Sequence, residues 1–385
     1  MAFQLFKGRL KFDRNELAGS FGDIGTDLPL IIGIILASGL NPVSVLVIYG
    51  LLQIMTGCIY GIPMPVQPLK AMAVIVITQK LGGNVLCGAG LAIGGLMLVF
   101  SLSGLINVIA RVVPVCVVRG IQLGLGLQLA TLALKDYVPV DGLTGYGIAF
   151  VSFIIIICLL GNRKYPPAIF VIVLGILYAL FYKLNLAHLS QGIGLQFPEF
   201  HVPVWSDILT GFLILTLPQL PLSIGNSILA TQQTARDLFP ERPPLTIRKI
   251  GLTYSIMNLI APFFGGIPVC HGAGGMAGHY TFGARTGGAI VIYGSMYLIA
   301  GLFLGDVFTD VVNIFPKPML GVILFFEAVA LMKLCFGTAF SKQQIMIVLI
   351  VGLMAVCLPY GYLVGMIVGT ILAHLWEKNL IRKID

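Results

Sequence analysis

Charged residues are scarce in this sequence of 385 residues: Asp, Glu, Lys and Arg together make up 10% of the chain. A soluble globular domain usually carries about 25% of such residues, so this chain has too few of them to cover a surface that faces water. Hydrophobic residues make up 58%, and they form continuous runs rather than the alternating pattern of a membrane β-barrel. These proportions predict a bundle of helices embedded in a lipid bilayer.

Motifs of several other protein classes are also missing. The seven cysteines form no Cys-x-x-Cys pair, and we interpret them as buried hydrophobic side chains, so no disulfide framework, metal site or other cofactor is expected. The sequence has no His-Glu-x-x-His and no Gly-x-Ser-x-Gly pattern, which argues against an enzyme. The net charge is +8, but the basic residues are scattered at the ends of apolar runs, so nucleic acid is not expected as a partner.

Gly, Pro and charged residues divide the chain into fourteen apolar segments. A helix needs about 20 residues to cross the hydrocarbon core of a bilayer, and two of the segments, 66–79 and 270–281, are too short for this. The complete set is expected at about 15–38, 42–61, 66–79, 84–109, 115–134, 144–161, 166–183, 206–231, 247–264, 270–281, 286–305, 313–333, 343–358 and 360–377.

The two short segments occupy the third and tenth places, which are equivalent in two sets of seven. Each follows a stretch rich in Gly and Pro, which begins at Gly61 in one case and at Gly265 in the other. Residues 28–33 and 220–225 also match each other. Short segments interrupted by Gly and Pro at corresponding positions of two halves are typical of transporters built from repeats. We therefore predict an all-α polytopic membrane protein with 14 transmembrane segments in a 7+7 inverted repeat, in which segments 3 and 10 are discontinuous half-helices.

The distribution of positive charge predicts that both termini are cytoplasmic. In this orientation eighteen of the 23 Lys and Arg residues lie on the cytoplasmic side, four lie outside, and Lys70 lies within a span, as the positive-inside rule requires. The expected organisation is a cytoplasmic N-terminal segment 1–14, a first repeat 15–190, a second repeat 205–378 and a cytoplasmic tail 379–385. We expect a multi-pass protein of a bacterial inner membrane or an equivalent membrane.

Polar residues in and around the two short segments form the predicted binding site. Ionisable groups inside a membrane are costly and are functional by default. The free N–H groups and the dipoles at two helix N-termini favour a negatively charged ligand, and extended backbone at membrane depth is tolerated where it lines a cavity. The candidate substrate-binding residues are Gln67, Pro68, Lys70, Gln219, Asn226, His271, Gly272, Gly274 and Gly275.

Several of these residues have a second interpretation that the sequence leaves open. Gln219 and Asn226 are either donors to the ligand or hydrogen-bond partners between helices. His271 is a ligand contact, a proton-handling group or an orienting hydrogen-bond partner. Lys70 either binds the ligand or belongs to a structural ion pair.

Three acidic residues, Asp23, Asp27 and Glu327, are candidates for charge balance or coupling. Asp23 and Asp27 are four residues apart and so share one helical face. Either of them would neutralise Lys70 in the empty site or exchange a proton during transport, whereas Glu327 is a candidate for gating. Since an aspartyl-protease dyad needs carboxylates from two facing helices, the shared helix also argues against a protease.

Three motifs occur in a fixed order along the chain: Phe21–Pro29 (FGDIGTDLP), Pro63–Ala71 (PMPVQPLKA) and Pro268–Gly275 (PVCHGAGG). They resemble the motifs of the molybdate transporter family that is related to sulfate permeases. The resemblance covers nearly the whole chain and implies molybdate uptake by alternating access. It also implies that a core domain (segments 1–4 and 8–11) moves against a gate domain (segments 5–7 and 12–14). The sequence stops shortly after the last predicted span, so we expect it to lack the cytoplasmic regulatory domain of the sulfate permeases.

The resemblance leaves more than one substrate open. Sulfate is the first alternative, because sulfate, tungstate and molybdate are tetrahedral dianions of similar shape. A nucleobase permease of the same fold is less favoured, since those permeases resemble each other in presenting glutamates where this chain has Gln219 and His271. The expected partners are the oxyanion and the lipid bilayer, while proton coupling and a homodimer stay open.

Overall fold

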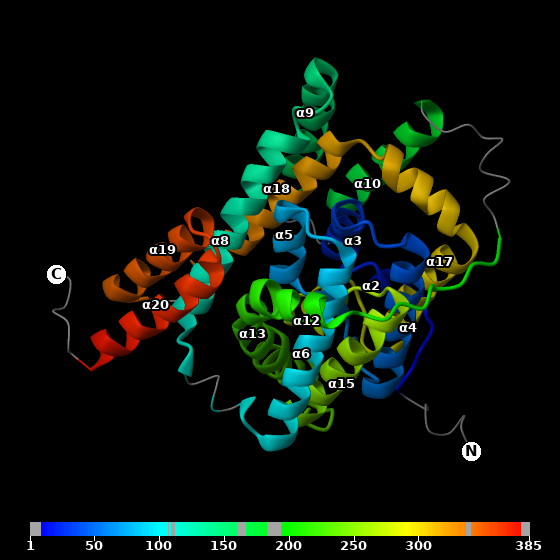
Figure 1. Cartoon of the computed structure of the whole chain (residues 1–385). Helices are drawn as coiled ribbons and strands as arrows, with labels where there is room; N and C mark the ends of the chain where they lie inside the picture. The colour runs from blue at the N-terminus through cyan, green and yellow to red at the C-terminus, as the bar shows by residue number, and fades with distance from the viewer. Residues whose placement is uncertain are drawn as a thin grey trace.

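The structure is a computed structural model of the chain. It describes residues 9–106, 108, 112–159, 167–182, 194–333, 335 and 340–378. The expected tail 379–385 and most of the expected N-terminal segment therefore lie outside the described residues. In the part that is described the chain is almost entirely helical (Figure 1).

Helices follow the apolar segments of the first half closely. Gly residues with positive φ end several of them, for example Gly39 (φ 70°) after α3 and Gly61 (φ 67°) after α4, as is common at helix C-termini. The elements are α2 (Arg14–Ser20), α3 (Ile24–Ser38), α4 (Pro42–Tyr60), β1 (Val66–Pro68), α5 (Lys70–Gln79), α6 (Gly83–Ser103), α8 (Val115–Leu132) with a π-helical turn at Ala133–Tyr137, α9 (Gly142–Leu159) and α10 (Pro167–Tyr182).

The second half begins with one continuous helical stretch of 34 residues, Trp205–Leu238, in which α-helical and π-helical turns alternate. The elements are α12 (Trp205–Gly211), a π-helical turn at Phe212–Thr216, α13 (Leu217–Leu222), π-helical turns at Ser223–Ala230, α14 (Thr231–Leu238), α15 (Ile247–Ile260) with a 3₁₀ turn at Ala261–Phe264, β2 (Val269–His271), α16 (Ala273–Thr281), α17 (Gly288–Ile314), α18 (Lys317–Lys333), α19 (Lys342–Cys357) and α20 (Gly361–Glu377).

Length and composition make the described helices suitable for a membrane. Seven helical stretches in the described part of the chain are long and apolar enough to cross a bilayer, and α5, α19 and α20 are shorter apolar helices. Large hydrophobic side chains such as Leu143, Phe150 and Ile371 are exposed on the outside. Apolar residues on both the inside and the outside indicate a protein whose surface contacts lipid.

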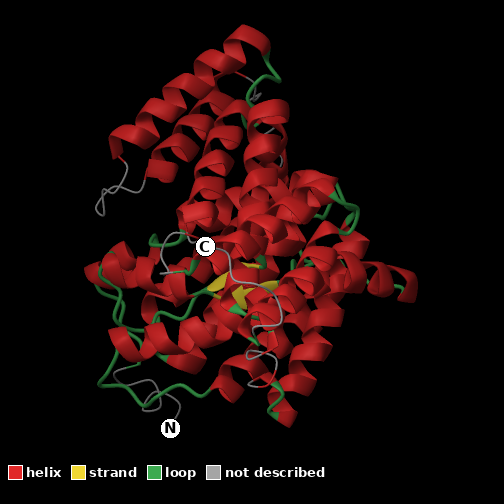
Figure 2. Cartoon of the chain, turned by 90° about the vertical axis from the view of Figure 1, so that its left-hand side faces the viewer, coloured by secondary structure: helices red, strands yellow, loops and turns green. Residues whose placement is uncertain are grey.

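Two three-residue strands, β1 and β2, lie among the helices (yellow in Figure 2). They pair antiparallel, with Val66 opposite His271, Gln67 opposite Cys270 and Pro68 opposite Val269. Each strand leads into a short helix, α5 or α16, after a single intervening residue. Because the strands are antiparallel, the two helices leave the strand pair at opposite ends, so both helix N-termini lie beside it.

Amide side chains from neighbouring helices hold the two strands in place. Gln53 of α4 donates from Nε2 to the carbonyl oxygen of Val66 (2.7 Å) and accepts from its N–H through Oε1 (2.9 Å). Asn258 of α15 makes the same pair of bonds with Val269, at 2.6 and 2.9 Å. Unpaired backbone groups are very costly in an interior without water. We call these two pairs of hydrogen bonds, from Gln53 to Val66 and from Asn258 to Val269, the amide clamps. They allow extended backbone in the interior of the helix bundle.

Glycines bring the helices around the strands close together. A Cβ atom added at Gly50 of α4 would lie 2.6 Å from the carbonyl oxygen of Gly294 in α17, and one added at Gly294 would lie 2.6 Å from that of Gly50. On the other side, Gly94 of α6 would bring a Cβ within 3.0 Å of the backbone of Asn258 in α15. Such close packing of small residues is typical of helices in membranes.

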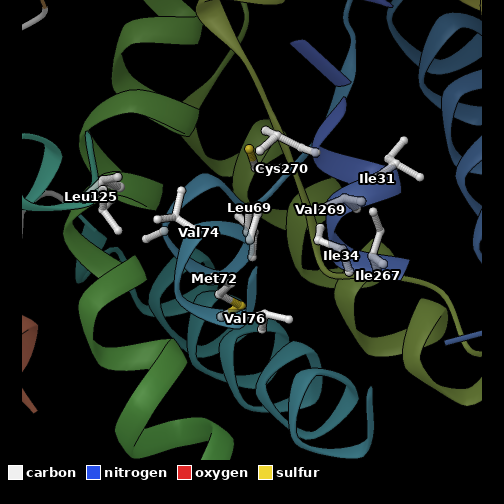
Figure 3. Packing of buried hydrophobic residues seen from close by; sticks show 14 of the residues in the cluster. Ile31, Ile34, Leu69, Met72, Val74, Val76, Leu125, Ile267, Val269 and Cys270 are labelled. Atoms are coloured by element: carbon white, nitrogen blue, oxygen red, sulfur yellow. The ribbon is translucent and has the colours of Figure 1, made fainter. Parts of the chain in front are cut away.

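α5 is buried on all sides in this first group of helices. Its residues from Ala71 to Ile77 are each at most 1% exposed, so the helix has no polar face. Figure 3 shows Leu69, Met72 and Val76 packed near Ile34 of α3 and Val269 of β2. A helix that is hydrophobic all round is stable only in the centre of a bundle.

A second group of helices lies beside the first, with α8, α19 and α20 at the left of Figure 1 and α9 at the top. α8 packs against α18 and α19, and α19 packs against α20, while α9 contacts α10 and α18. Gly124 of α8 approaches α19 so closely that an added Cβ would lie 2.5 Å from the Cβ of Ala355. The molecule thus consists of one group that encloses the strand pair and another that packs against it.

We expect both Gln53→Ala and Asn258→Ala to destabilise the protein, and Asn258→Ala to do so more. Gln53→Ala leaves the buried N–H of Val66 without its partner, while the carbonyl oxygen of Val66 keeps its hydrogen bond from Tyr49. Asn258→Ala removes the partner of both the N–H and the C=O of Val269, at about 1–3 kcal/mol per group. The apparent melting temperature of the purified protein in detergent should fall by several degrees in both variants. Gln79→Ala removes an exposed amide and should leave it unchanged. Equal melting temperatures for all three variants would contradict the stabilising role of the hydrogen bonds that Gln53 and Asn258 make to the strands.

Candidate functional site

Lys70 is the first residue of α5, and its side chain forms an ion pair with Glu327 of α18. Lys70 Nζ lies 3.1 Å from Glu327 Oε1, and the two side chains are 27% and 12% exposed. The direct partner of Lys70 is thus Glu327, whereas Asp23 accepts a hydrogen bond from Gln67 and Asp27 accepts from Tyr49 and Tyr293. The ion pair joins α5, in the group around the strands, to α18, in the second group.

Gln219 of α13 covers the N-terminus of α5. Its Oε1 accepts hydrogen bonds from the backbone N–H groups of Ala71 (2.9 Å) and Met72 (3.3 Å), and its Nε2 donates to Ser223 Oγ (3.1 Å). Leu69, the N-cap residue, has no side chain that could do this. Two of the four free N–H groups of this helix are therefore satisfied by Gln219, which acts here as an acceptor rather than as a donor to a ligand.

Gln67 and Asp23 lie over the first turn of α16. Gln67 Nε2 donates to Asp23 Oδ2 at 2.5 Å. A Cβ added at Gly272 would overlap Gln67 Oε1, and one added at Gly275 would overlap Asp23 Oδ2. The glycines thus make room for an amide and a carboxylate at the positive end of a helix, which is a favourable place for negative charge.

One side of the same turn is open. A Cβ added at Gly274 would meet no atom within 4 Å, and Gly274 is exposed. Pro68, in contrast, is buried in the strand pair opposite Val269 and positions the start of α5. Because Lys70 and Glu327 lie within electrostatic range of Asp23, the N-termini of α5 and α16 share one polar cluster.

The hydrogen bonds of Asp27 come from two tyrosines. Its Oδ2 accepts from the hydroxyl groups of Tyr49 (2.5 Å) and Tyr293 (3.3 Å), and the residue is completely buried. The Tyr49 hydroxyl also lies 2.6 Å from the carbonyl oxygen of Val66. Asp27 is therefore connected to β1 through Tyr49 rather than to Lys70.

His271 of β2 is also completely buried, and both its ring nitrogens have partners. Nε2 lies 2.8 Å from Thr253 Oγ1 of α15, and Nδ1 lies 3.3 Å from the carbonyl oxygen of Pro65. The ring packs edge-on against Tyr60, with 5.4 Å between centroids. These contacts favour the orienting role of His271 over a direct contact with a ligand.

Asn226 lies in a different place, in the π-helical turns Ser223–Ala230. It lines a cavity of about 350 Å³ together with Arg119 and Gln122 of α8, where Arg119 Nη1 donates to Gln122 Oε1 at 2.8 Å. π-Helical turns are frequent at functional sites. The structure thus places Asn226 and Arg119 in the lining of one cavity, and Lys70 is not part of that lining.

Sequence reasoning missed the residues that support the site, above all Gln53, Asn258, Tyr49 and Tyr293. A signal for the first two was present, because Gln53 and Asn258 are separated by the same 205 positions as Gly61 and Gly266. Nothing in the sequence distinguishes Tyr49 and Tyr293 from the other tyrosines in apolar segments.

Solved structures share this arrangement of helices. The transmembrane domain of a cyanobacterium bicarbonate transporter, BicA, matches with a TM-score of 0.66 at 17% identity, over 94% of this chain and 97% of that one. The murine anion transporter Slc26a9 in its inward-facing state matches with a TM-score of 0.69 at 14% identity, over 97% and 70%. The fold is therefore that of the helical membrane transporters of the solute carrier 26 type.

Within that class, the chain belongs to the molybdate transporter family. The family model described as "Molybdate transporter of MFS superfamily" matches residues 15–129 and 211–331. Molybdate transporter 1 of Arabidopsis thaliana is 31% identical over 411 residues, which cover 94% of this chain and 88% of the relative. Molybdate transporter 1 of Chlamydomonas reinhardtii is 26% identical over 423 residues, which cover 80% and 81%. The resemblance of the three motifs is confirmed, and the family consists of transporters rather than enzymes.

We expect Gly275→Ala to impair transport without preventing insertion into the membrane. The added Cβ displaces Asp23 from Gln67 at the first turn of α16, which should reduce uptake of labelled molybdate, the anion for which the relatives are named, by about tenfold or more. Gly95→Ala is the control, since a Cβ at Gly95 meets no atom within 4 Å. Normal uptake by Gly275→Ala at an equal protein level would show that transport does not require the close packing of Asp23 against Gly275.

Proposed function

We propose that this protein is a secondary-active transporter of a tetrahedral oxyanion, above all molybdate, that works by alternating access. The observation that carries the proposal is the position of Lys70, a cation at the N-terminus of a half-helix beside the strand pair. Half-helix N-termini that point at an anionic group are how transporters of this general design bind substrates. The names of the relatives support molybdate as the substrate.

The ion pair between Lys70 and Glu327 suggests how binding is linked to movement. Glu327 neutralises Lys70 in this structure, so an arriving dianion competes with this carboxylate. Once the dianion has replaced it, Glu327 is repelled by the bound charge. Since Glu327 is on α18 and Lys70 on α5, the exchange loosens the contact between the two groups of helices and permits their relative movement.

The remaining site residues have supporting roles while the dianion replaces Glu327 at Lys70. Gly274 lets the ligand approach the backbone of α16 closely on its open side. Gly272 and Gly275 make room for Gln67 and Asp23, and Gln67 orients Asp23. Gln219 positions α5, and Asn226 with Arg119 lines a cavity that would serve as an access route. Asp23 and Asp27 remain the candidates for proton coupling.

We also propose the finer architecture of fourteen segments in a 7+7 inverted repeat, with residues 15–190 and 205–378 as the two repeats. It is supported by the paired clamps, Gln53 on β1 and Asn258 on β2, and by the packing of α4 along α17 and of α6 along α15. In this architecture the group around the strands is the core and the second group is the gate. Both termini would be cytoplasmic in a bacterial inner or equivalent membrane, and a homodimer stays a prediction.

Lys70→Ala should reduce uptake of labelled molybdate by about 30-fold or more. In the proposed bound state Lys70 pairs with the dianion. Removing one member of a buried charge pair between a protein and its ligand costs about 2–5 kcal/mol, and each 1.4 kcal/mol corresponds to tenfold. Lys342→Ala, at the exposed start of α19, is the matched control. If Lys70→Ala is present in the membrane and transports at the normal rate, the assignment of Lys70 is incorrect.

The substrate itself is tested by competition. Uptake of labelled molybdate should be suppressed by unlabelled molybdate and tungstate at lower concentrations than by sulfate or bicarbonate. Sulfate as the stronger competitor would make sulfate the substrate. Uptake of uracil in place of any oxyanion would favour the nucleobase alternative.

Glu327→Gln should lower the KM for the oxyanion by about fivefold, because the competing carboxylate is gone. This factor corresponds to about 1 kcal/mol for a partly exposed ion pair. The maximal rate should fall at the same time, since the ligand no longer breaks a contact between α5 and α18. Glu241→Gln, an exposed carboxylate, should change neither quantity. An unchanged or raised KM in Glu327→Gln would contradict competition between Glu327 and the substrate.

A further inference from the structure

A second, larger cavity lies where α4 and α14 end and α15 begins. Its volume is about 700 Å³, and four basic residues, Arg9, Arg236, Arg242 and Lys249, line it. Among the described residues that line it there is no Asp or Glu. Asp237 and Glu241 belong to the same segment of the chain, but neither of them is part of the lining.

Arg9 and Lys249 converge on a single acceptor, the carbonyl oxygen of Ile59 in the last turn of α4. Arg9 Nη2 lies 2.6 Å from this oxygen and Lys249 Nζ lies 3.5 Å from it. A helix C-terminus carries only about half a negative charge, which is too little to balance two cations. The cavity therefore has a net positive charge.

The position of Arg9 depends on the backbone of Gly61. Gly61 has a φ of 67°, and an added Cβ would lie 2.8 Å from Arg9 Nε, so a side chain at this position would push the guanidinium away. Arg9 is thus held by the fold at the edge of the cavity rather than extended into solvent.

The floor of the cavity is apolar. Tyr60 lies there with its hydroxyl group 2.6 Å from Thr253 Oγ1 and with Lys249 Nζ 4.9 Å from its ring centroid. Phe239, Pro243 and Leu245 add further apolar surface. Basic groups around an apolar floor suit an organic anion better than a bare inorganic ion.

We propose that this cavity binds a phosphate-bearing organic anion through Arg9, Arg236 and Lys249. Guanidinium groups bind phosphate oxygens in a bidentate manner, and a volume of about 700 Å³ lies within the usual range of roughly 300–1,000 Å³ for sites of organic ligands. The cavity is separate from the oxyanion site, since Lys70, Gln67 and Glu327 do not line it. A phospholipid headgroup and a soluble organic phosphate share this chemistry.

Two probes distinguish these sources with the purified full-length protein. Inositol hexakisphosphate is titrated in detergent by calorimetry, and lipid binding is counted by native mass spectrometry with nanodiscs that contain phosphatidylinositol phosphate. Excess molybdate is present throughout, to occupy the oxyanion site. We expect saturable binding of one probe per chain. Binding of the soluble probe identifies a soluble phosphate, and binding of the lipid alone identifies a headgroup.

Arg9→Gln combined with Lys249→Gln should weaken that binding by about tenfold or more. The single variant Arg236→Gln, which changes an exposed residue at the end of α14, should weaken it severalfold and covers the case in which the double variant fails to fold. Arg248→Gln removes the same charge next to Lys249, from an exposed residue that does not line the cavity, and should bind normally. No saturable binding of either probe, or an equal loss in Arg248→Gln and Arg236→Gln, would overturn the proposal.

Discussion

The need to pair every backbone N–H and C=O in an interior without water is the constraint on which the rest of this structure depends. A transporter that binds its substrate in mid-membrane at helix N-termini has to interrupt helices there, and each interruption exposes unpaired backbone groups. This protein pairs them in two ways: β1 and β2 bond to each other, and Gln53 and Asn258 bond to the edges that remain. Gln219 does the same for the start of α5. The site exists because these amides make the broken helices stable.

The second feature of the site is that its positive charges are balanced by nearby carboxylates. Two positive features near the strand pair each have a negative counterpart among the described residues: Glu327 faces Lys70, and Asp23 lies at the N-terminus of α16. A dianion cannot simply be added to such a site, because it would meet two carboxylates in a medium of low dielectric constant. It has to replace at least one of them. In the proposed exchange the displaced carboxylate is that of Glu327 on α18, which belongs to the other group of helices, and the proposal therefore links ligand binding to relative movement of the two groups.

The same balance of charge distinguishes the site at the strand pair from the cavity lined by Arg9 and Lys249. Near the strand pair positive groups are paired with acids, whereas the cavity between α4, α14 and α15 brings Arg9 and Lys249 to one carbonyl oxygen without an acid among its described lining residues. A site that must release its ligand on each cycle benefits from a built-in competitor. A site without such a competitor retains its ligand for longer, which suits a structural or regulatory anion rather than cargo.

The sequence by itself determined the membrane environment, the approximate bounds of the helices and the two interruptions at Gly61–Pro68 and Gly265–Gly272. These follow from runs of consecutive residues, since apolar length, Gly and Pro act locally on the backbone. It also indicated Lys70, because a cation in an apolar run is conspicuous. Only the tertiary structure decided that Lys70 pairs with Glu327, that Gln219 offers its oxygen rather than its nitrogen, and that Asn226 lies with Arg119. Those partners are far apart in the chain, and which of them meet depends on how the helices pack, a property that no local pattern encodes.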